Sequence, residues 1–231
     1  LRRIGMVVPV LGALALLLYA FSLWMPLRGA SRPPRTIVLY GFSILGESLN
    51  KGVFPEFQNV WRAKTGERVE LVSSFAGSGT VTNQILMGVP AEVALLSLEL
   101  DALKLAAGGV VPKDSWKTLP RAGVVNRTPF VILVRRGNPR NIHDFADLTA
   151  PGVRVVHPDP LTSGGANWAI VAEYGAGFRG SGGADGGYRM LLGVWKNVVA
   201  QAASARAART QFENGFGDAL ITYEQEALYD K

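Results

Sequence analysis

Three short stretches of small and hydroxyl-bearing residues each follow a strand-like run and open a helix-like one. They are AGSGT at residues 76–80, TSGG at residues 162–165, and Ser204-Ala205. The start of a helix presents unpaired backbone N–H groups and the positive end of a dipole of about half an elementary charge. Glycine lets an anion approach that backbone closely. If the fold brings the three stretches together, they can hold a dianion without a lysine or arginine in contact with it.

Other kinds of chemistry find little support in the residue types. AGSGT is not a P-loop, since no Gly-Lys-Ser/Thr follows, and it lacks the dinucleotide pattern G-x-G-x-x-G. The chain has no cysteine, which excludes disulfides, thiolate zinc sites and cysteine nucleophiles. A serine hydrolase needs a histidine base, and His143 is interpreted as a surface residue. His157 ends a strand near Ser163, but a proline follows it and no serine of the chain stands in a G-x-S-x-G motif. With no HExxH motif either, we expect no catalytic residues, no metal site and no cofactor.

The spacing of apolar runs predicts how these stretches are positioned. Strands are expected at residues 36–40, 69–72 and 93–96, separated by helices at 47–64, 81–87 and 98–107. A long strand at 129–135 begins a second alternation, with a short element at 144–148, strands at 153–157, 198–201 and 218–223, and helices at 166–174, 188–196 and 205–213. The glycine-rich residues 175–187 are expected to form a flexible surface loop. This alternation predicts an α/β fold with parallel strands, whose carboxyl ends are the usual place for ligands.

Individual side chains within these elements have simple structural interpretations. The predicted helix at 47–64 carries an apolar stripe at steps of four, formed by Leu49, Val53, Phe57 and Trp61. Trp61 and Trp168 are interpreted as core residues on helix stripes. Asp159 is interpreted as a turn residue, because it stands between two prolines. Glu224 and Glu226 are interpreted as a solvated helix face.

The basic charge of the chain is concentrated in its first 35 residues. The formal net charge is +6, and five arginines with no acidic residue stand in that stretch, so residues 36–231 carry a net charge of +1. The remainder lacks the basic surface that nucleic-acid binding needs. Residues 4–27 contain no charged side chain and follow Arg2 and Arg3, which predicts a signal peptide or an uncleaved membrane anchor. Either interpretation places the rest of the chain outside the cytoplasm.

Six motifs in order along the chain resemble the periplasmic sulfate-binding proteins of ABC importers. They are YGFS at residues 40–43, WRAKTG at 61–66, GSG at 77–79, LVRRGNP at 133–139, TSGGANW at 162–168 and GDALI at 217–221. The fifth and sixth are the most specific, and the resemblance extends from residue 36 to the end. It implies a two-lobed type II periplasmic binding protein fold that closes on its ligand. It also implies that the chain is truncated at its C-terminus. The expected regions are a signal peptide or anchor (1–28), a linker (29–35), lobe 1 (36–128), lobe 2 (129–221) and a return towards lobe 1 (222–231).

The resemblance also implies a set of ligand-binding residues. Side-chain hydroxyls and backbone N–H groups would come from Ser78, Ser163, Gly164, Gly165 and Ala205. Tyr223 stands where the family has an indole donor, and a phenol can also donate. Gly41 stands where the family has an aspartate that offers its backbone N–H. These two departures bear on the identity of the anion more than on anion binding itself.

The expected ligand is sulfate or a related tetrahedral oxyanion. Sulfate only accepts hydrogen bonds at neutral pH, whereas phosphate keeps a proton that a carboxylate in the site can select. None of the three stretches contains Asp or Glu, which favours sulfate; thiosulfate, molybdate and tungstate remain open. The expected partners are ABC permease subunits, with the chain itself a periplasmic monomer. An ester hydrolase and the effector domain of a transcriptional regulator are minor alternatives, since the first lacks its histidine base and the second its N-terminal helix-turn-helix.

Overall fold

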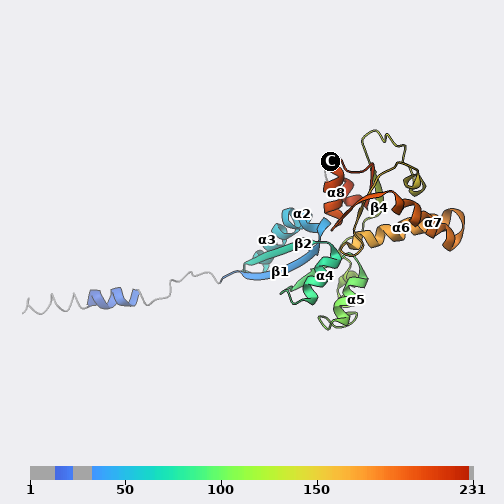
Figure 1. Cartoon of the computed structure of the whole chain (residues 1–231). Helices are drawn as coiled ribbons and strands as arrows, with labels where there is room; N and C mark the ends of the chain where they lie inside the picture. Colours follow the sequence, from blue (N-terminus) through green and yellow to red (C-terminus); the bar gives the residue numbers. More distant parts are fainter. Residues whose placement is uncertain (1–13, 23–32, 229–231) are drawn as a thin grey trace, which may run out of the picture.

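The computed structural model describes residues 14–22 and 33–228. Two sheets form the body of the chain, one with strand order β2-β1-β3 and one with order β4-β7-β5-β6. The strands of the first sheet all come from the first half of the body and those of the second from the other half (Figure 1). The bounds of the predicted lobes, 36–128 and 129–221, remain a prediction.

The three-stranded sheet is parallel throughout. β1 (Arg35–Phe42) pairs with β2 (Val69–Ala76) on one side and β3 (Val93–Leu95) on the other. Parallel neighbours need long crossovers, and helices supply them. The connecting and following helical segments are η1 (Ser43–Leu45), α2 (Gly46–Ser48), the π-helical turn η2 (Leu49–Val53), α3 (Phe54–Thr65), α4 (Ser78–Leu86), α5 (Glu99–Ala107), η3 (Ser115–Thr118) and η4 (Pro120–Gly123).

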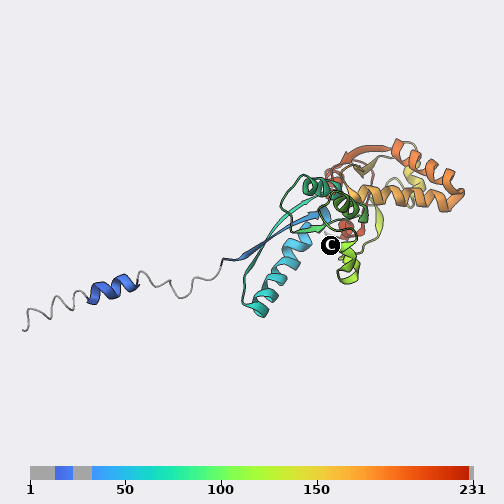
Figure 2. The ribbon, with the colours of Figure 1, turned by 90° about the horizontal axis from the view of Figure 1, so that it is seen from below.

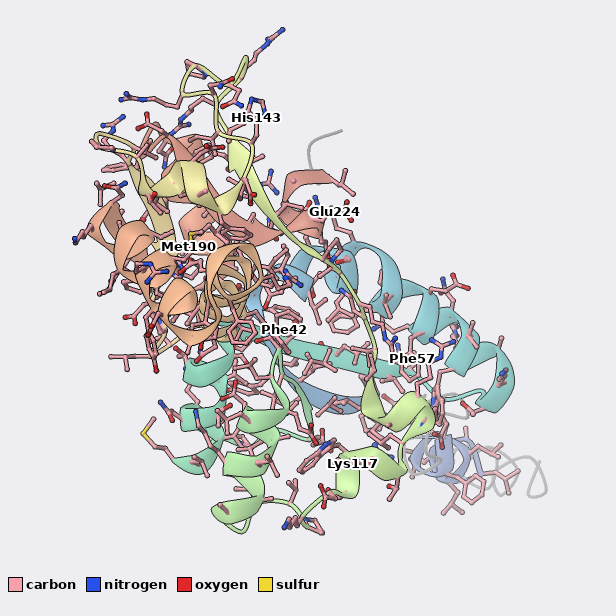
Figure 3. The ribbon with its side chains drawn as sticks, turned by 90° about the vertical axis from the view of Figure 1, so that its right-hand side faces the viewer. Phe42, Phe57, Lys117, His143, Met190 and Glu224 are labelled. Carbon is pink, nitrogen blue, oxygen red and sulfur yellow. The ribbon has the colours of Figure 1, made fainter. Side chains whose placement is uncertain are left out.

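The apolar stripe predicted on the first helix faces a core only in part, since Leu49 packs against the cluster of Ile44 and Leu45. Val53 is 55% exposed and Phe57 is 38% exposed, whereas Phe54 is the buried residue of α3. Figure 3 shows α3, with Phe57 labelled, along one side of the three-stranded sheet. The predicted spacing assumes one continuous α-helix over residues 47–64. A π-helical turn precedes α3 and shifts the phase of the residues after it.

The four-stranded sheet is mixed. β4 (Phe130–Val134) runs antiparallel to β7 (Ala219–Tyr223), while β5 (Val155–Pro158) is parallel to β7 and to β6 (Val198–Ala202). Its helical segments are η5 (Phe145–Thr149), α6 (Gly164–Ser181), α7 (Gly183–Lys196), α8 (Ala205–Glu213) and α9 (Glu224–Leu228). The main core lies on this sheet and consists of Ile142, Leu148, Val153, Val155, Ala169, Val194, Ala219 and Ile221.

The flexible loop predicted at residues 175–187 was wrong. The region is helical, with α6 continuing to Ser181 and α7 starting at Gly183, and the two helices lie side by side in both ribbon views (Figures 1 and 2). A Cβ at Gly177 would overlap the Gly186 carbonyl oxygen, and one at Gly187 would lie 2.5 Å from the Tyr174 ring. The glycines therefore permit close helix packing, which lowers their conformational freedom and overrides their poor helix propensity.

The two sheets meet at an apolar junction formed by both halves of the chain. Ile44 and Leu45, which follow β1, pack with Ala205 and Tyr223 of the other half. Phe42, at the end of β1, packs against this cluster, and Figure 3 shows it between the two sheets. This junction lies at the carboxyl ends of β1 and β7, where the predicted binding residues also lie.

The predicted signal peptide or anchor lies largely outside the described residues, except for 14–22, which are helical. Among the helices that the structure describes, none combines the length and apolar character required to span a bilayer. The proposal that residues 1–28 target or anchor the chain therefore remains a prediction from sequence.

Candidate functional site

The three predicted stretches meet in space. The Thr80 N–H donates to the Thr162 carbonyl oxygen at 3.2 Å. A Cβ at Gly77 would overlap that same carbonyl oxygen and would lie 2.5 Å from the carbonyl oxygen of Ala203. One glycine thus lies against the second stretch and against Ala203, the residue directly before the third. The starts of α4, α6 and α8 therefore converge from both halves of the chain.

The starts of α6 and α8 leave buried backbone N–H groups without acceptors in the part of the chain that the structure describes. Gly164, Gly165 and Ala205 are buried, yet within residues 33–228 their N–H groups have no hydrogen-bond acceptor. A Cβ at Gly165 would lie 3.4 Å from the Ala205 Cβ, so the starts of α6 and α8 are adjacent. Buried unpaired N–H groups are rare in native proteins and call for a partner. Three such groups at helix N-termini suit an anion.

Ser163 and Ser204 precede two of these helices and behave differently. Ser204 caps α8, because its side chain accepts a hydrogen bond from the Ala207 N–H at 3.1 Å. Ser163 is also buried, but its side chain makes no capping hydrogen bond, and its N–H donates to the Asp159 carbonyl oxygen at 2.8 Å. The Ser163 hydroxyl is therefore free of the capping role that serines at this position usually have.

Ser78 lies at the start of α4 with its hydroxyl already engaged. It donates to the Asp101 carboxylate at 2.6 Å and accepts from the Ser97 N–H at 3.0 Å. A carboxylate only accepts hydrogen bonds, so the proton of Ser78 points to Asp101. Lys104 pairs with the same carboxylate at 3.3 Å. In this arrangement Ser78 contacts the site through Ser97, and its direct donation to a ligand remains a prediction.

Tyr223 ends β7 beneath the start of α6. A Cβ at Gly165 would lie 3.0 Å from a ring carbon of Tyr223 and 3.3 Å from its hydroxyl oxygen. The residue is 5% exposed, and its ring packs against Phe130 at a centroid distance of 4.5 Å. Burial raises the pKa of Tyr223 to about 12, against a smaller opposing effect of the Ser97 hydroxyl. The phenol therefore stays protonated, and its hydroxyl can donate.

Gly41 occupies a structural position in the sheet. It lies in β1 between Phe75 of β2 and Leu95 of β3, and a Cβ at this position would lie 2.8 Å from the Phe75 ring. The absence of a side chain makes room for that ring. A binding role for its backbone N–H remains a prediction.

Sequence reasoning missed the Ser97 and Thr162 hydroxyls. Both oxygens are buried, and neither has a well-formed hydrogen bond within the described part of the chain. Thr162 belongs to a stretch that the sequence singled out, so its side chain could have been included. Ser97 follows β3 at the carboxyl end of the sheet, but no glycine beside it marks the position. Its proximity to the other donors depends on how α5 and the β3 strand pack.

Trp168 is not a core residue, contrary to the expectation from its helix stripe. It is 45% exposed, and its indole N–H donates to the Ser97 carbonyl oxygen at 2.9 Å, which links α6 to the strand end of the other half. A cavity of about 630 Å³ opens beside Ser97, Trp168 and Tyr223. Solutes can thus approach the converging donors from this side.

Neither histidine forms part of the site. His143 is exposed and contacts Asn141, and Figure 3 shows it at the far edge of the four-stranded half. His157 is buried, with Nε2 3.0 Å from Glu173 and Nδ1 2.6 Å from the Pro158 carbonyl oxygen. Both ring nitrogens are therefore engaged away from Ser163. Among the residues that the structure describes, no group of three or more His, Asp or Glu side chains could hold a metal ion.

The chain is similar to known proteins over most of its length. Residues 46–231 match the family model described as bacterial extracellular solute-binding protein. The sulfate-binding protein of Escherichia coli (strain K12) is 36% identical over 186 residues, which cover 80% of this chain and 55% of the relative. The thiosulfate-binding protein of Pseudomonas aeruginosa is 31% identical over 205 residues, covering 88% and 61%. The chain thus spans a little over half the length of these curated relatives.

A solved structure supports the same assignment. The sulfate-binding protein SubI from Mycobacterium tuberculosis H37Rv superposes with a TM-score of 0.76 and 31% identity, over 84% of this chain and 67% of that one. This similarity confirms the α/β, two-lobed type II periplasmic binding fold. The chain belongs to the family of bacterial extracellular solute-binding proteins.

Proposed function

We propose that this chain captures sulfate, or a closely related oxyanion such as thiosulfate, outside the cytoplasm for an ABC importer. The observation that carries the proposal is the convergence of three helix starts, two of which place N–H groups at Gly164, Gly165 and Ala205 that have no acceptor within residues 33–228. A doubly negative ligand at that point satisfies all three and interacts with three helix dipoles. The relatives named sulfate-binding and thiosulfate-binding support this choice of ligand.

The charges around the site favour neutralisation by dipoles. Arg206, in the first turn of α8, is paired with Glu226 at 2.9 Å and with Glu47 at 3.6 Å. Its charge is therefore balanced by protein carboxylates. The ligand then depends on N–H and O–H donors, each worth about 1.5–3 kcal/mol when it binds a charged group.

The donor set also predicts selectivity. Backbone N–H groups donate hydrogen bonds and cannot accept one from the O–H of a protonated phosphate. They therefore suit an anion that is fully ionised. Asp101, the buried carboxylate near the site, accepts from Ser78 and pairs with Lys104. It is thus engaged within the protein. We expect sulfate and thiosulfate to bind more tightly than phosphate at neutral pH.

Calorimetric titration of the 231-residue chain with sulfate, thiosulfate, molybdate, tungstate and phosphate tests this proposal. A ligand at 100 times its dissociation constant should stabilise the chain by about 2.7 kcal/mol, which thermal unfolding can detect in parallel. Absence of heat and of stabilisation with every anion would overturn the proposal. A preference for thiosulfate or molybdate over sulfate would reassign the ligand within the same class.

The remaining features of the proposal concern the whole protein. As an extracytoplasmic binding protein it acts without catalysis and delivers its ligand to permease subunits in the membrane. Incubation with a chromogenic sulfate or phosphate ester separates this function from hydrolysis. We expect no release of the chromophore. Release that is lost in Ser163→Ala would instead identify an enzyme.

A further inference from the structure

The cavity beside the converging helix starts is larger than an inorganic oxyanion needs. Its volume is about 630 Å³. Cavities of about 300–1,000 Å³ accommodate organic ligands, whereas sulfate is only a few times larger than a water molecule, which takes about 30 Å³ in the liquid. Sulfate bound at the helix starts therefore leaves most of this space to other groups.

Two residues of the lining connect the cavity to the helix starts. Ser97 and Tyr223 both line it. A Cβ at Gly164 would overlap the Ser97 Oγ, and one at Gly165 would lie 3.3 Å from the Tyr223 hydroxyl oxygen. The N–H groups of these two glycines have no acceptor within residues 33–228. The cavity thus adjoins the backbone donors, and a ligand held by them can extend into it.

The rest of the lining is mainly apolar and comes from both halves. Phe42 at the end of β1 and Trp116 of η3 belong to the three-stranded half, and Trp168 belongs to α6 of the four-stranded half (Figure 3 labels Phe42). Trp168 is 45% exposed, and Phe42 and Trp116 are partly exposed. An organic group that covers these rings removes apolar surface from water, which favours binding.

The charged residues of the lining suit a negatively charged ligand. They are Glu99, Lys117 and Arg127, of which two are basic and one is acidic. The Glu99 carboxylate is paired with the Lys117 ammonium at 3.0 Å. The lining therefore carries a net positive charge and admits an anion.

We propose that the site also binds organic sulfonates and sulfate monoesters, with the sulfo group at the helix starts and the organic substituent in the cavity against Trp116 and Trp168. This assignment rests on the proposed function. The terminal oxygens of a sulfo group only accept hydrogen bonds, as those of sulfate do. A substituent that leaves the helix starts towards Ser97 and Tyr223 enters the cavity. Binding makes and breaks no covalent bond.

A series of alkanesulfonates tests the role of the cavity. In calorimetric titration of the 231-residue chain, affinity should rise from methanesulfonate through propanesulfonate to pentanesulfonate by about fourfold for each buried methylene. Benzenesulfonate, whose ring can cover the indoles, should also bind more tightly than methanesulfonate. Equal affinity along the series would overturn the inference.

Competition with sulfate tests where the sulfo group lies. Benzenesulfonate should displace sulfate, and the apparent dissociation constant of benzenesulfonate should rise in proportion to the sulfate concentration, because one set of donors serves both ligands. Simultaneous binding of the two would separate the sulfonate from the helix starts and contradict the proposal.

Filling the cavity should discriminate between the two ligands. Ala102 is a partly exposed lining residue of α5. Ala102→Phe places a ring at the wall and should weaken benzenesulfonate binding about tenfold or more, while sulfate affinity stays within about twofold. Ala107→Phe is the matched control, since it makes the same substitution at an exposed position of the same helix that is not part of the lining. It should change neither affinity.

Removing part of the apolar wall should discriminate in the same direction. Trp116→Ala should weaken benzenesulfonate binding about tenfold and leave sulfate affinity within about twofold. Trp61→Ala removes an indole of α3 that packs against Phe57 at a centroid distance of 5.9 Å, and it should leave the ratio of the two affinities unchanged. A ratio that is also unchanged in both Ala102→Phe and Trp116→Ala would overturn the inference.

The outcomes distinguish this inference from the proposed function. A chain that binds sulfate but none of the sulfonates overturns the inference alone. If the chain binds neither sulfate nor any other oxyanion, the proposed function fails and the inference fails with it. Sulfonate binding that competes with sulfate and is selectively weakened in Ala102→Phe and Trp116→Ala supports both.

Discussion

The two sheets differ sharply in how completely they are buried. Every residue of β5 and β7 in the four-stranded sheet is buried. In the three-stranded sheet β3 has no buried residue, and β1 and β2 have few. The buried cluster that packs on the three-stranded sheet is also small, with Val81, Ile85 and Leu105 as its members. Most of the hydrophobic stabilisation therefore lies in the four-stranded half.

Buried polar groups are extensively paired in the four-stranded half. It buries the His157 and Glu173 side chains with partners for each, and Arg135 donates to the carbonyl oxygens of Phe212, Phe216 and Gly217. The pairing is not complete, because among the residues that the structure describes the buried side-chain oxygens of Gln211 and Thr222 have no hydrogen-bond partner. The well-packed half thus holds its polar groups mainly through contacts within the same half.

Among the variants that compare the two halves, substitution of Glu173 in the four-stranded half should lower the unfolding free energy most. One carboxyl oxygen contacts His157 Nε2 at 3.0 Å, and the other accepts from the Trp195 indole at 3.1 Å. Glu173→Ala leaves these groups buried without a partner and should cost about 3–5 kcal/mol of unfolding free energy. Glu70→Ala, on the exposed face of β2, should change it by about 0.5 kcal/mol or less. Urea denaturation measures both, and equal losses would contradict the contrast.

Two truncations of apolar strand residues, one in each sheet, compare the two sheets directly. Ile221 in β7 is fully buried, whereas Val72 in β2 is 49% exposed. Ile221→Ala should destabilise the chain by about 2–5 kcal/mol, because it removes buried surface and leaves a cavity. Val72→Ala should cost roughly 1 kcal/mol or less, since half of the side chain is already in water. Denaturation midpoints that shift by the same amount would show that the two sheets contribute equally.

A smaller effect concerns Glu226, which lies where the two halves meet. The sequence interpretation as a solvated residue was wrong, since the side chain is buried and pairs with Arg206. Burial raises the pKa of the Glu226 carboxyl, against the opposing charges of Arg206 and Arg209. The folded chain therefore binds this proton more tightly than the unfolded chain. The stabilising contribution is fully present below pH 4.5 and is lost as the pH rises through the folded value.

Glu226→Gln should remove this part of the pH dependence. Unfolding free energies measured at several pH values above 4.5 should fall less steeply in the variant.

Asp218, inside the four-stranded half, is the matched case of opposite sign. Burial by itself raises the pKa of its carboxyl, but hydrogen bonds from Arg154 and the charges of Arg140 and Arg154 hold it below 3.8. Its contribution is present above that pH and is lost on acidification, so Asp218→Asn should flatten the acid limb only.

Local sequence patterns predicted the strands and the helix starts well. The helix predicted at 205–213 has those bounds in the structure, and the three stretches at 76–80, 162–165 and 204–205 each end at a helix start. Asp159 forms the expected turn, because its carboxylate accepts from the Leu161 N–H at 2.8 Å. These features depend on neighbours within a few residues, which a sequence displays directly.

Features that depend on distant residues were predicted poorly. The glycines at 175–187 indicated a loop, but contacts between α6 and α7 make the region helical. Trp168 and Glu226 were assigned to the wrong environments, since their partners, Ser97 and Arg206, are far away in sequence. Ser97 was not recognised at all.

The amino-acid sequence by itself determined which segments can offer unpaired N–H groups, because glycine and hydroxyl residues at helix starts are a local chemical property. It also determined membership in the family through motifs whose order is preserved. Only the tertiary structure decided which donors remain free. The Ser78 hydroxyl donates to the Asp101 carboxylate, whereas the Ser97 hydroxyl has no such acceptor among the described residues. This difference depends on partners that packing brings from elsewhere in the chain.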